Sequence, residues 1–437
     1  MAANEARTEK VVIEKLIYGG EGLAHHNGST VFVPFVLPQE TVSVEPTEQK
    51  KKFIRARVER IVQPSPQRVA PRCPHFAVCG GCDYQHIPYA EQLRYKTEIL
   101  RETLRRIGGI EWPGEIALHS AEPWGYRNRA QWKVRPPGDA SAGTDDAAKS
   151  GIGYFRAGSS QFCAVEECAI LSPLLLKTLL SLRSAVYGGA LPQKLREIEA
   201  FADVSDSKLL LTATFAGFPS RAAEAAEKMR GIAPEIESLL FHDPSRERME
   251  LFGPGFIETE ARGAKYRVGH FSFFQVNRFL VDEMVREVVE REAGGRLALD
   301  LFAGVGLFSV PLSKRFARVV AVESNPAAAR DLEENASGQG SIEVRTADAE
   351  RFLDRYKEKQ ELVVLDPPRA GMSPGGVARL ARLAPAQITY VSCEPPTLAR
   401  DLKALVAAGY EISEVRLFDL FPQTFHMEAV VRLRSSK

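Results

Sequence analysis

The C-terminal part of the chain alternates short apolar runs with stretches that are compatible with helices. The apolar runs lie near residues 297–301, 318–322, 341–345, 362–365 and 387–392, and a helix is expected before them at 279–292. Short apolar runs separated by helical stretches are typical of buried parallel strands. The pattern therefore predicts an α/β fold with a doubly wound parallel sheet.

Reactive or charged side chains stand at or just after the ends of these predicted strands. They are Asp300, Glu323, Asp348, Asp366 and Cys393. Ligands of open α/β sheets bind beyond the carboxyl ends of the strands. The shared placement predicts an active site at this edge of the sheet.

A glycine turn follows the first of these strands. Gly304 and Gly306 let the backbone approach a ligand closely, and Glu323 ends the next strand, where an acid can hold ribose hydroxyls. The turn lacks the full G-x-G-x-x-G spacing of a pyrophosphate site. These features favour a cofactor without phosphates, and S-adenosylmethionine fits that description.

The N-terminal region shows short alternating strands separated by glycine turns. We predict a small β-barrel at residues 10–64, preceded by a flexible tail at residues 1–9. The stretch from Val44 to Gln63 has six basic residues against three acids, namely Lys50, Lys51, Lys52, Arg55, Arg57 and Arg60 against Glu45, Glu48 and Glu59. Such a stretch suits RNA or single-strand binding, and a solvated charge run on the barrel edge is the alternative.

Three cysteines lie close together after this region. Cys73, Cys79 and Cys82 have the spacing C-x(5)-C-G-G-C, and the two glycines permit a sharp turn that brings the sulfurs together. A metal site then requires a fourth ligand, for which the candidates are Cys163, Cys168, His75 and His86. Both zinc and an iron–sulfur cluster suit this chemistry.

Residues 65–270 predict α+β structure, including an amphipathic helix at 88–107. Four basic residues and no acids lie between Arg127 and Arg135, beside Trp124, Tyr126 and Trp132. This combination suits phosphates and unstacked bases, and a β-strand with one basic face explains it equally well. A loop rich in Gly, Ala, Asp and Ser, at 136–150, is predicted to be mobile.

Composition narrows the class of protein. A length of 437 residues allows two or three domains, and a net charge of +1 confines any nucleic-acid surface to local clusters. The sequence contains no apolar run long enough to span a bilayer, and its polar N-terminus does not resemble a signal peptide. Six cysteines in a chain of this size indicate metal binding or catalysis in a reducing cytosol rather than disulfides. We therefore expect a cytoplasmic protein without a membrane partner.

The chain resembles the RNA uracil-5-methyltransferase family over nearly its whole length. The matching motifs are Phe273-Phe-Gln-Val-Asn277, Asp300-Leu-Phe-Ala-Gly-Val-Gly306, Leu365-Asp-Pro-Pro-Arg-Ala-Gly371, Val391-Ser-Cys-Glu-Pro395, Thr397-Leu-Ala-Arg-Asp401 and Phe421-Pro-Gln-Thr-Phe-His-Met-Glu428. The sequence departs from the family pattern at Glu394, where members usually have Asn or Asp, and at Leu307, where some have Asn.

The resemblance implies an OB-like TRAM barrel at 10–64, a central domain at 65–270 and a class I methyltransferase domain at 271–437. It implies Cys393 as the nucleophile, Glu428 as the base and Phe273 as a stacking partner of the target base. It also implies a cofactor site formed by Gln275, Phe302, Glu323, Asp348 and Asp366, and a 4Fe-4S cluster held by Cys73, Cys79, Cys82 and Cys168.

The resemblance also implies an RNA partner. We expect 23S rRNA as the substrate of a monomeric enzyme. The alternatives are the same reaction on a tRNA uridine and a non-catalytic RNA-binding protein.

Overall fold

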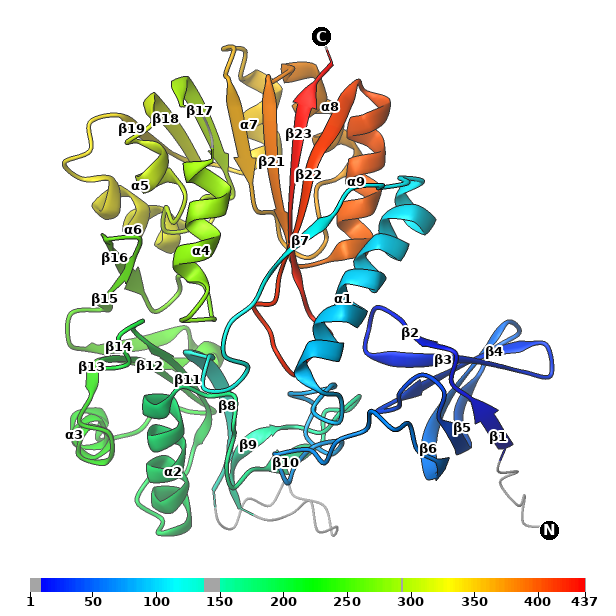
Figure 1. The fold of residues 1–437 in the computed structure, drawn as a ribbon. Coiled ribbons are helices and arrows are strands. Elements are labelled where there is room, and N and C mark those ends of the chain that lie inside the picture. Colours follow the sequence, from blue (N-terminus) through cyan, green and yellow to red (C-terminus); the bar gives the residue numbers. More distant parts are fainter. Residues whose placement is uncertain (1–8, 137–149, 292–293, 437) are drawn as a thin grey trace. The chain divides into compact units, whose positions relative to one another are not determined.

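A computed structural model describes residues 9–136, 150–291 and 294–436. The predicted tail at 1–9 and the predicted mobile loop at 136–150 lie outside these ranges, apart from their end residues. The chain divides into two compact units, which Figure 1 colours along the sequence. The first unit contains Met1–Glu102, Arg156–Ser159 and Phe421–His426, and the second contains Thr103–Phe155, Ser160–Leu420 and Met427–Lys437.

The first unit carries a six-stranded sheet in the order β1-β5-β6-β4-β3-β2. Neighbouring strands are antiparallel except β4 and β6. Alternate residues point into a core that includes Val11, Val31, Val33 and Val42. The strands are β1 (Glu9–Val12), β2 (Lys15–Leu16), β3 (Glu21–His26), β4 (Ser29–Pro34), β5 (Thr41–Gln49) and β6 (Phe53–Gln63).

Strand β3 was not predicted from the sequence. Its inward positions are Gly22 and Ala24, which give almost no apolar signal. A Cβ at Gly22 would lie 2.4 Å from a methyl carbon of Val36 and 2.8 Å from one of Ile13, so only glycine fits between them. The prediction failed because strands are recognised by large apolar residues at their inward positions, and the inward positions of β3 are occupied by small ones.

Helix α1 (Tyr89–Thr103) matches the predicted helix and continues as a π-helical turn, Leu104–Gly108. Within the first unit it holds the segment 421–426. The side-chain amide of Gln92 donates to Gln423 Oε1 (3.0 Å), Gln423 N donates to Gln92 Oε1 (3.0 Å), and Lys96 Nζ donates to the Phe421 carbonyl (3.1 Å). This anchored segment leads into the strand that begins at Glu428.

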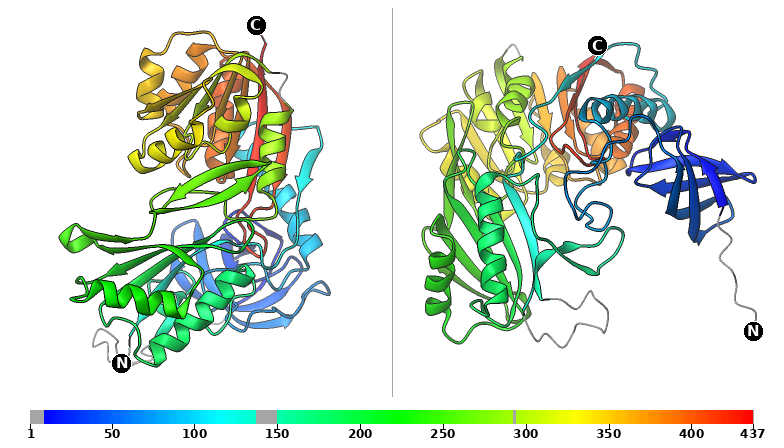
Figure 2. Two further views of the ribbon diagram at one scale, coloured as in Figure 1. Left: turned by 90° about the vertical axis from the view of Figure 1, so that its left-hand side faces the viewer. Right: turned by 60° about the horizontal axis from the view of Figure 1, so that its bottom comes forward.

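The second unit contains two large sheets. The central one has the order β10-β9-β8-β11-β12-β13-β14, and helices α2 (Pro173–Tyr187) and α3 (Ala222–Ile232) cover one of its faces (Figure 2, left). A hairpin of β15 (Phe256–Ala261) and β16 (Ala264–Gly269) follows. The strands of the central sheet are β8 (Arg129–Arg135), β9 (Gly151–Phe155), β10 (Phe162–Ala164), β11 (Leu195–Ala202), β12 (Leu209–Phe215), β13 (Ile236–Asp243) and β14 (Arg248–Phe252).

The second sheet is the predicted doubly wound one, in the order β19-β18-β17-β20-β21-β23-β22-β7. Its first five strands are parallel, whereas β23 runs antiparallel to both of its neighbours. The strands are β17 (Gly295–Leu301), β18 (Phe316–Glu323), β19 (Ile342–Thr346), β20 (Leu362–Leu365), β21 (Gln387–Ser392), β22 (Tyr410–Phe418) and β23 (Glu428–Ser435). The helices are α4 (Val281–Val285), α5 (Ser309–Leu312), α6 (Pro326–Ala336), α7 (Ala349–Arg355), α8 (Pro374–Leu383) and α9 (Pro395–Ala407).

Strand β7 (Ile116–His119) completes this sheet beside β22. The sequence analysis assigned these residues to the central region, because four residues provide too little pattern to reveal a partner three hundred residues away. The His119 ring stacks on Phe418 with 4.3 Å between ring centroids. Across the described residues, no helix is long and apolar enough to cross a bilayer.

Candidate active site at the strand ends

A buried acid, Asp300, supports the turn after β17. Asp300 accepts a hydrogen bond from the hydroxyl of Ser309, the first residue of α5, and thereby ties the strand end to the helix start. Burial, with a contribution from Glu323, raises the pKa of Asp300 to about 7. Asp300 is buried, so we assign it to the support of the turn rather than to ligand contact.

The turn itself requires left-handed backbone. Phe302, Gly304 and Gly306 have φ values of 63°, 56° and 90°. At Gly306 a Cβ would lie 2.5 Å from Leu332 Cδ1 on α6, so glycine is required there by packing as well as by conformation. The predicted cofactor turn is therefore tightly built.

Glu323 closes the turn from the next strand. Its Oε2 accepts from Gly304 N at 2.8 Å, and its Oε1 accepts from Asn325 N at 2.7 Å. Each carboxylate oxygen retains a lone pair after one such bond. A half-buried acid held in this way can accept hydrogen bonds from two vicinal hydroxyls of a ribose.

The other predicted cofactor residues differ in setting. Asp348 is exposed and caps α7, since its Oδ1 accepts from Arg351 N at 2.9 Å. Asp366 follows β20, and Gln275 is 6% exposed on a loop. Glu323, Asp348 and Asp366 thus follow parallel strands of one sheet, whereas Gln275 and Phe302 come from loops.

The register of two antiparallel strands brings the predicted nucleophile and base together. The last paired residues of β21 and β23 are Ser392 and Ala429. Cys393 follows β21 and Glu428 begins β23, so each lies one residue beyond this last pair. The two side chains are close enough for the charge of Glu428 to affect the pKa of the Cys393 thiol.

The charges around Cys393 oppose its ionisation in the free protein. Burial raises the pKa of the thiol to about 12, and the carboxylates of Glu428 and Asp366 add to the effect, while Arg369 opposes it. Burial and then Asp366 also raise the pKa of Glu428 well above its ordinary value. Arg369 was not predicted as a site residue, although its place directly after the strand-end Asp-Pro-Pro was a usable signal.

Glu428 is suited to accept a proton. It is 4% exposed, and its Oε1 is buried without a hydrogen-bond partner among the described residues. A buried carboxylate oxygen without a partner is costly to leave in place. Such an atom is free to bond a proton that a ligand presents.

The turn after Cys393 does not depend on the side chain of residue 394. Glu394 N donates to Ser392 Oγ at 3.1 Å, and the main chain of Glu394 then leads into α9. The departure from the family pattern at Glu394 therefore leaves this turn hydrogen-bonded through its backbone.

A loop between β16 and α4, residues 269–277, is here called the strap. Phe273 on the strap is 57% exposed, and the guanidinium carbon of Arg129 lies 5.9 Å from the centre of its ring. At the far end of the strap, Asn277 Nδ2 donates to the Leu420 carbonyl at 3.1 Å. The predicted stacking residue is therefore accessible on a loop with fixed ends.

Two aromatic residues that we expected near the RNA are unavailable to it. Tyr126 and Trp132 are fully buried, which excludes them from stacking on bases. The basic face of β8 is also partly neutralised, because Arg129 pairs with Glu199 (2.6 Å) and Lys133 pairs with Glu197 on β11. The strand with one basic face, which was the alternative interpretation, describes this stretch better.

The predicted cluster ligands come from two units of the chain. Cys73, Cys79 and Cys82 lie on a loop built from turns in the first unit, where Cys73 N donates to Gln85 Oε1 at 2.9 Å. Cys168 belongs to the second unit, and the Tyr154 hydroxyl lies 3.9 Å from its sulfur. Cys163, another candidate for the fourth ligand, is buried.

A second group of potential metal ligands is already neutralised by arginines. His119, Glu283 and Glu287 each place a ligating atom within 4.8 Å of the others. Arg416, however, lies 3.0 Å from Glu287 Oε2 and 3.3 Å from His119 Nε2, and Arg286 pairs with both glutamates. This group is therefore an ion-pair network between β7, α4, the π-helical turn Arg286–Glu290 that follows α4, and β22.

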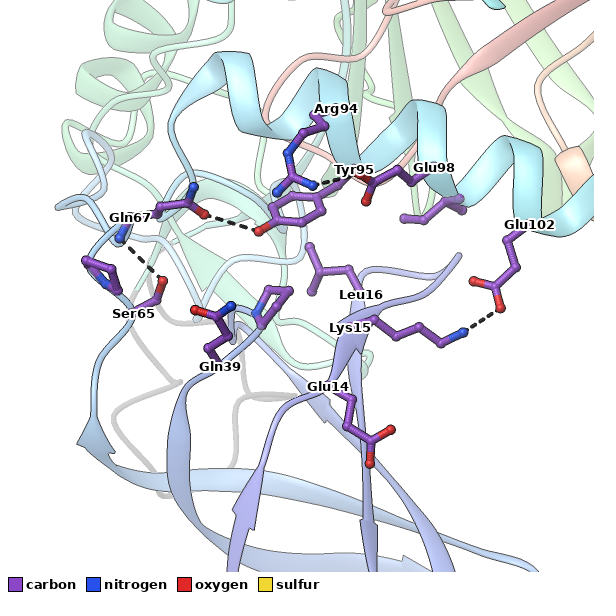
Figure 3. A pocket seen from close by; sticks show the side chains of 13 residues that line it. Glu14, Lys15, Leu16, Gln39, Ser65, Gln67, Arg94, Tyr95, Glu98 and Glu102 are labelled. Carbon is purple, nitrogen blue, oxygen red and sulfur yellow. Dashed lines mark hydrogen bonds and ion pairs between the residues drawn. The ribbon is translucent and has the colours of Figure 1, made fainter. Parts of the chain in front are cut away.

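The first unit has a cavity of about 360 Å³ between its sheet and α1 (Figure 3). Its charged side chains pair among themselves, since Lys15 binds Glu102 and Arg94 binds Glu98. The Tyr95 hydroxyl donates to Gln67 Oε1 at 3.3 Å across one end. With its charges paired in this way, the cavity shows no reactive group, and the chemistry lies at the strand ends of the second unit.

Comparison with known proteins agrees with this site. A family model described as tRNA (Uracil-5-)-methyltransferase matches residues 255–436, and a TRAM domain model matches residues 3–58. The chain is 36% identical to the 23S rRNA (uracil(1939)-C(5))-methyltransferase RlmD of Salmonella choleraesuis, over 94% of this chain and 93% of that one. It is 33% identical to an uncharacterized RNA methyltransferase of Aquifex aeolicus, over 97% and 98%.

A solved structure is similar over the whole chain. The tRNA (uracil-54, C5)-methyltransferase of Pyrococcus abyssi, in complex with S-adenosyl-L-homocysteine, is 27% identical, with a TM-score of 0.73 and coverage of 97% of this chain and 100% of that one. The fold and the strand-end site thus define an S-adenosylmethionine-dependent methyltransferase that acts on RNA. More narrowly, the chain belongs to the RNA uracil-C5-methyltransferase family.

Proposed function

We propose that this enzyme methylates carbon 5 of a uridine in RNA through a covalent adduct on Cys393, with Glu428 as the base. The observation that supports the proposal is the register of β21 and β23, whose last pair, Ser392 and Ala429, directly precedes Cys393 on one strand and follows Glu428 on the other. The unpartnered buried oxygen of Glu428 supports its role.

The chemistry needs both residues. Carbon 5 of uracil is a poor nucleophile, and addition of the Cys393 thiolate to carbon 6 turns the ring into an enolate whose carbon 5 carries the negative charge. When bound, S-adenosylmethionine supplies an electrophilic methyl group for that carbon. Glu428 then removes the carbon 5 proton, the double bond re-forms, and the thiolate leaves carbon 6.

We infer that the RNA is 23S rRNA. The curated relatives that act on 23S rRNA match at 36% identity over 94% of the chain, which supports this choice over tRNA. The tRNA alternative is supported by the Pyrococcus structure at 27% identity. Mapping 5-methyluridine in rRNA and tRNA from a strain lacking the gene tests it, and loss of the modification from tRNA alone would select the alternative.

We further propose that Glu323 binds the ribose of the cofactor within a site completed by Gln275, Phe302, Asp348 and Asp366. Glu323→Ala is expected to weaken S-adenosylmethionine binding by roughly 1.5–3 kcal/mol, since a hydrogen bond to a charged group has that worth. Calorimetry measures the change, with Glu333→Ala, an exposed residue of α6, as the control. Unchanged affinity in Glu323→Ala would remove this residue from the site.

Finally, we propose that Cys73, Cys79, Cys82 and Cys168 hold a 4Fe-4S cluster. Three cysteines close together on one turn-rich loop suit such a cluster, and the fourth ligand rests on the family resemblance. The cluster would stabilise that loop and takes no part in methyl transfer.

Anaerobically purified protein is expected to be brown and to contain iron and sulfide. Cys168→Ser should lose the colour, because it removes one of four thiolate ligands, whereas Cys163→Ser should keep it. Absorption spectra and metal analysis measure both results. Stoichiometric zinc without iron in the parent protein would replace the cluster by a zinc site.

A further inference from the structure

The strap exposes a second large aromatic ring for which the reaction as described has no use. Phe271 is 47% exposed, two residues before Phe273, which is 57% exposed. Two large apolar rings that stay exposed this close together do not contribute the folding free energy that their burial would give. Exposed apolar groups of this kind commonly mark a binding site. Two residues span at most about 7 Å along the chain, which is the spacing of neighbouring nucleotides rather than of distant sites.

Helix α6 and its N-cap residue, Asn325, hold the strap in place on one side. On α6, Asp331 Oδ2 accepts from Gly269 N (2.7 Å) and from the Ser272 hydroxyl (2.5 Å). Asn325 Nδ2 donates to the carbonyl of Phe271 itself at 3.2 Å. The backbone at Phe271 is therefore fixed to the start of α6, the helix that follows Glu323 of the candidate cofactor site.

The central sheet fixes the strap from the other side. The two ring nitrogens of His270 hydrogen-bond to Thr212 and Ser238, each at 3.0 Å. On β8, the Arg129 guanidinium donates to the Ser272 carbonyl at 2.8 Å. A ring on a backbone anchored on both sides loses little conformational entropy when it binds a ligand.

The neighbours of Phe271 extend its exposed apolar surface. The ring meets that of His242 on β13 edge-to-face, with 6.0 Å between centroids. His242 pairs across the sheet with Met249 of β14, which is 56% exposed on the same face. Two residues along the strap from Phe271, the guanidinium carbon of Arg129 lies 5.9 Å from the centre of the Phe273 ring. Exposed aromatic rings with an arginine beside them suit an unstacked base and its phosphate better than they suit an apolar protein surface.

We propose that Phe271, backed by His242, is a second stacking site that binds an unpaired nucleobase adjacent to the target uridine in the RNA. The inference rests on the proposed function and on the role that the family resemblance implies for Phe273, which is to stack on the target base. The enzyme would then accept only RNA in which a base next to the target uridine is also unpaired and unstacked, because Phe271 has to bind that base.

The test measures the affinity of Phe271→Ala, Phe271→Leu and Phe271→Tyr for a short RNA centred on the mapped uridine, by fluorescence anisotropy. Phe271→Ala is expected to bind about 5- to 100-fold more weakly, which is the effect of losing one base–aromatic stack. Phe271→Tyr should keep the affinity of the parent, and Phe271→Leu should bind nearly as weakly as Phe271→Ala. Leu180→Ala, an exposed apolar residue of α2 on the helix-covered face of the central sheet, is the control and should change nothing.

An RNA with an abasic nucleotide on one side of the target uridine identifies the partner. With the matching abasic RNA, the parent and Phe271→Ala should bind equally, because the stack is already missing. A difference that persists with abasic nucleotides on both sides would overturn the inference, as would normal affinity in Phe271→Ala. Phe273→Ala distinguishes the Phe271 inference from the stacking role expected of Phe273. If Phe273→Ala weakens binding and Phe271→Ala does not, only the second stacking site is contradicted. If neither variant weakens binding, the stacking role of Phe273 is contradicted as well.

Discussion

The Glu428→Gln variant is expected to accumulate RNA covalently attached to Cys393. The amide keeps the shape of the side chain but cannot remove the carbon 5 proton, so addition and methyl transfer proceed and release stops. Turnover should fall on the order of 10²- to 10⁴-fold, the usual worth of a general base. Denaturing gels of reactions run with S-adenosylmethionine that is labelled in its methyl group measure the adduct directly.

Two variants serve as controls for this trap. Cys393→Ala should give neither turnover nor adduct, whereas Cys163→Ala, which alters another buried thiol, should behave as the parent. An adduct in Cys393→Ala, or none in Glu428→Gln while RNA is still bound, would reverse or remove the assigned roles. If Glu428→Gln turns over normally, His426, two residues earlier, becomes the base to test.

Most of the parallel strands could be predicted from the sequence because they contain continuous apolar runs. Strands β17, β18, β20 and β21 have runs of buried apolar residues, such as Val363 and Val364 of β20. Strand β19, at the edge of the sheet, instead alternates apolar and charged residues. The acids that follow them mark the strand ends, so the edge of the sheet that holds the site followed from the same pattern. In the central region the sequence likewise predicts a strand at Leu209–Phe215 and a helix at Pro173–Tyr187, and β12 and α2 have these bounds because each is strongly apolar on its buried side.

Contacts between distant residues could not be predicted in this way. The proximity of Cys393 to Glu428 depends on the antiparallel register of β21 and β23, and no local period encodes a register. The bond from Asp331 to Ser272 likewise joins residues 59 positions apart. Only the family motifs indicated the first of these contacts, and nothing in the sequence indicated the second.

The same gap explains the wrong expectation about aromatic residues near the RNA. Tyr126 and Trp132 stand beside arginines in the sequence, yet both point into the core, and Phe271 and Phe273 are exposed instead. Side chains alternate along β8, so Trp132 lies on the same face as Ala130 and Val134 and opposite Arg129 and Lys133. A strand at these residues is enough to predict that separation of the two faces. The choice of face, however, depends on α2 and α3, which arrive later in the chain.

The Cys393 thiol is expected to be almost unreactive in the free enzyme and to become reactive when the cofactor binds. A pKa of about 12 leaves a thiolate fraction on the order of 10⁻⁴ at pH 8. Because the shift is upward, reactivity should rise continuously from pH 7 to pH 10 without the plateau near pH 8.5 that an ordinary thiol shows. Alkylation by iodoacetamide, with the Cys393 peptide quantified by mass spectrometry, measures this profile.

The sulfonium charge of S-adenosylmethionine should lower this pKa by offsetting the carboxylates of Asp366 and Glu428. One positive charge about 5–6 Å away is worth about 3 kcal/mol, or roughly a hundredfold in thiolate fraction. A thiolate of lower pKa is also less nucleophilic, which reduces the expected gain in alkylation rate to about tenfold. S-adenosylhomocysteine is the matched control, because it covers the same surface without the charge. Equal alkylation rates with the two ligands would show that the cofactor does not activate the thiol, and a plateau near pH 8.5 in the free enzyme would show that the carboxylates do not suppress it.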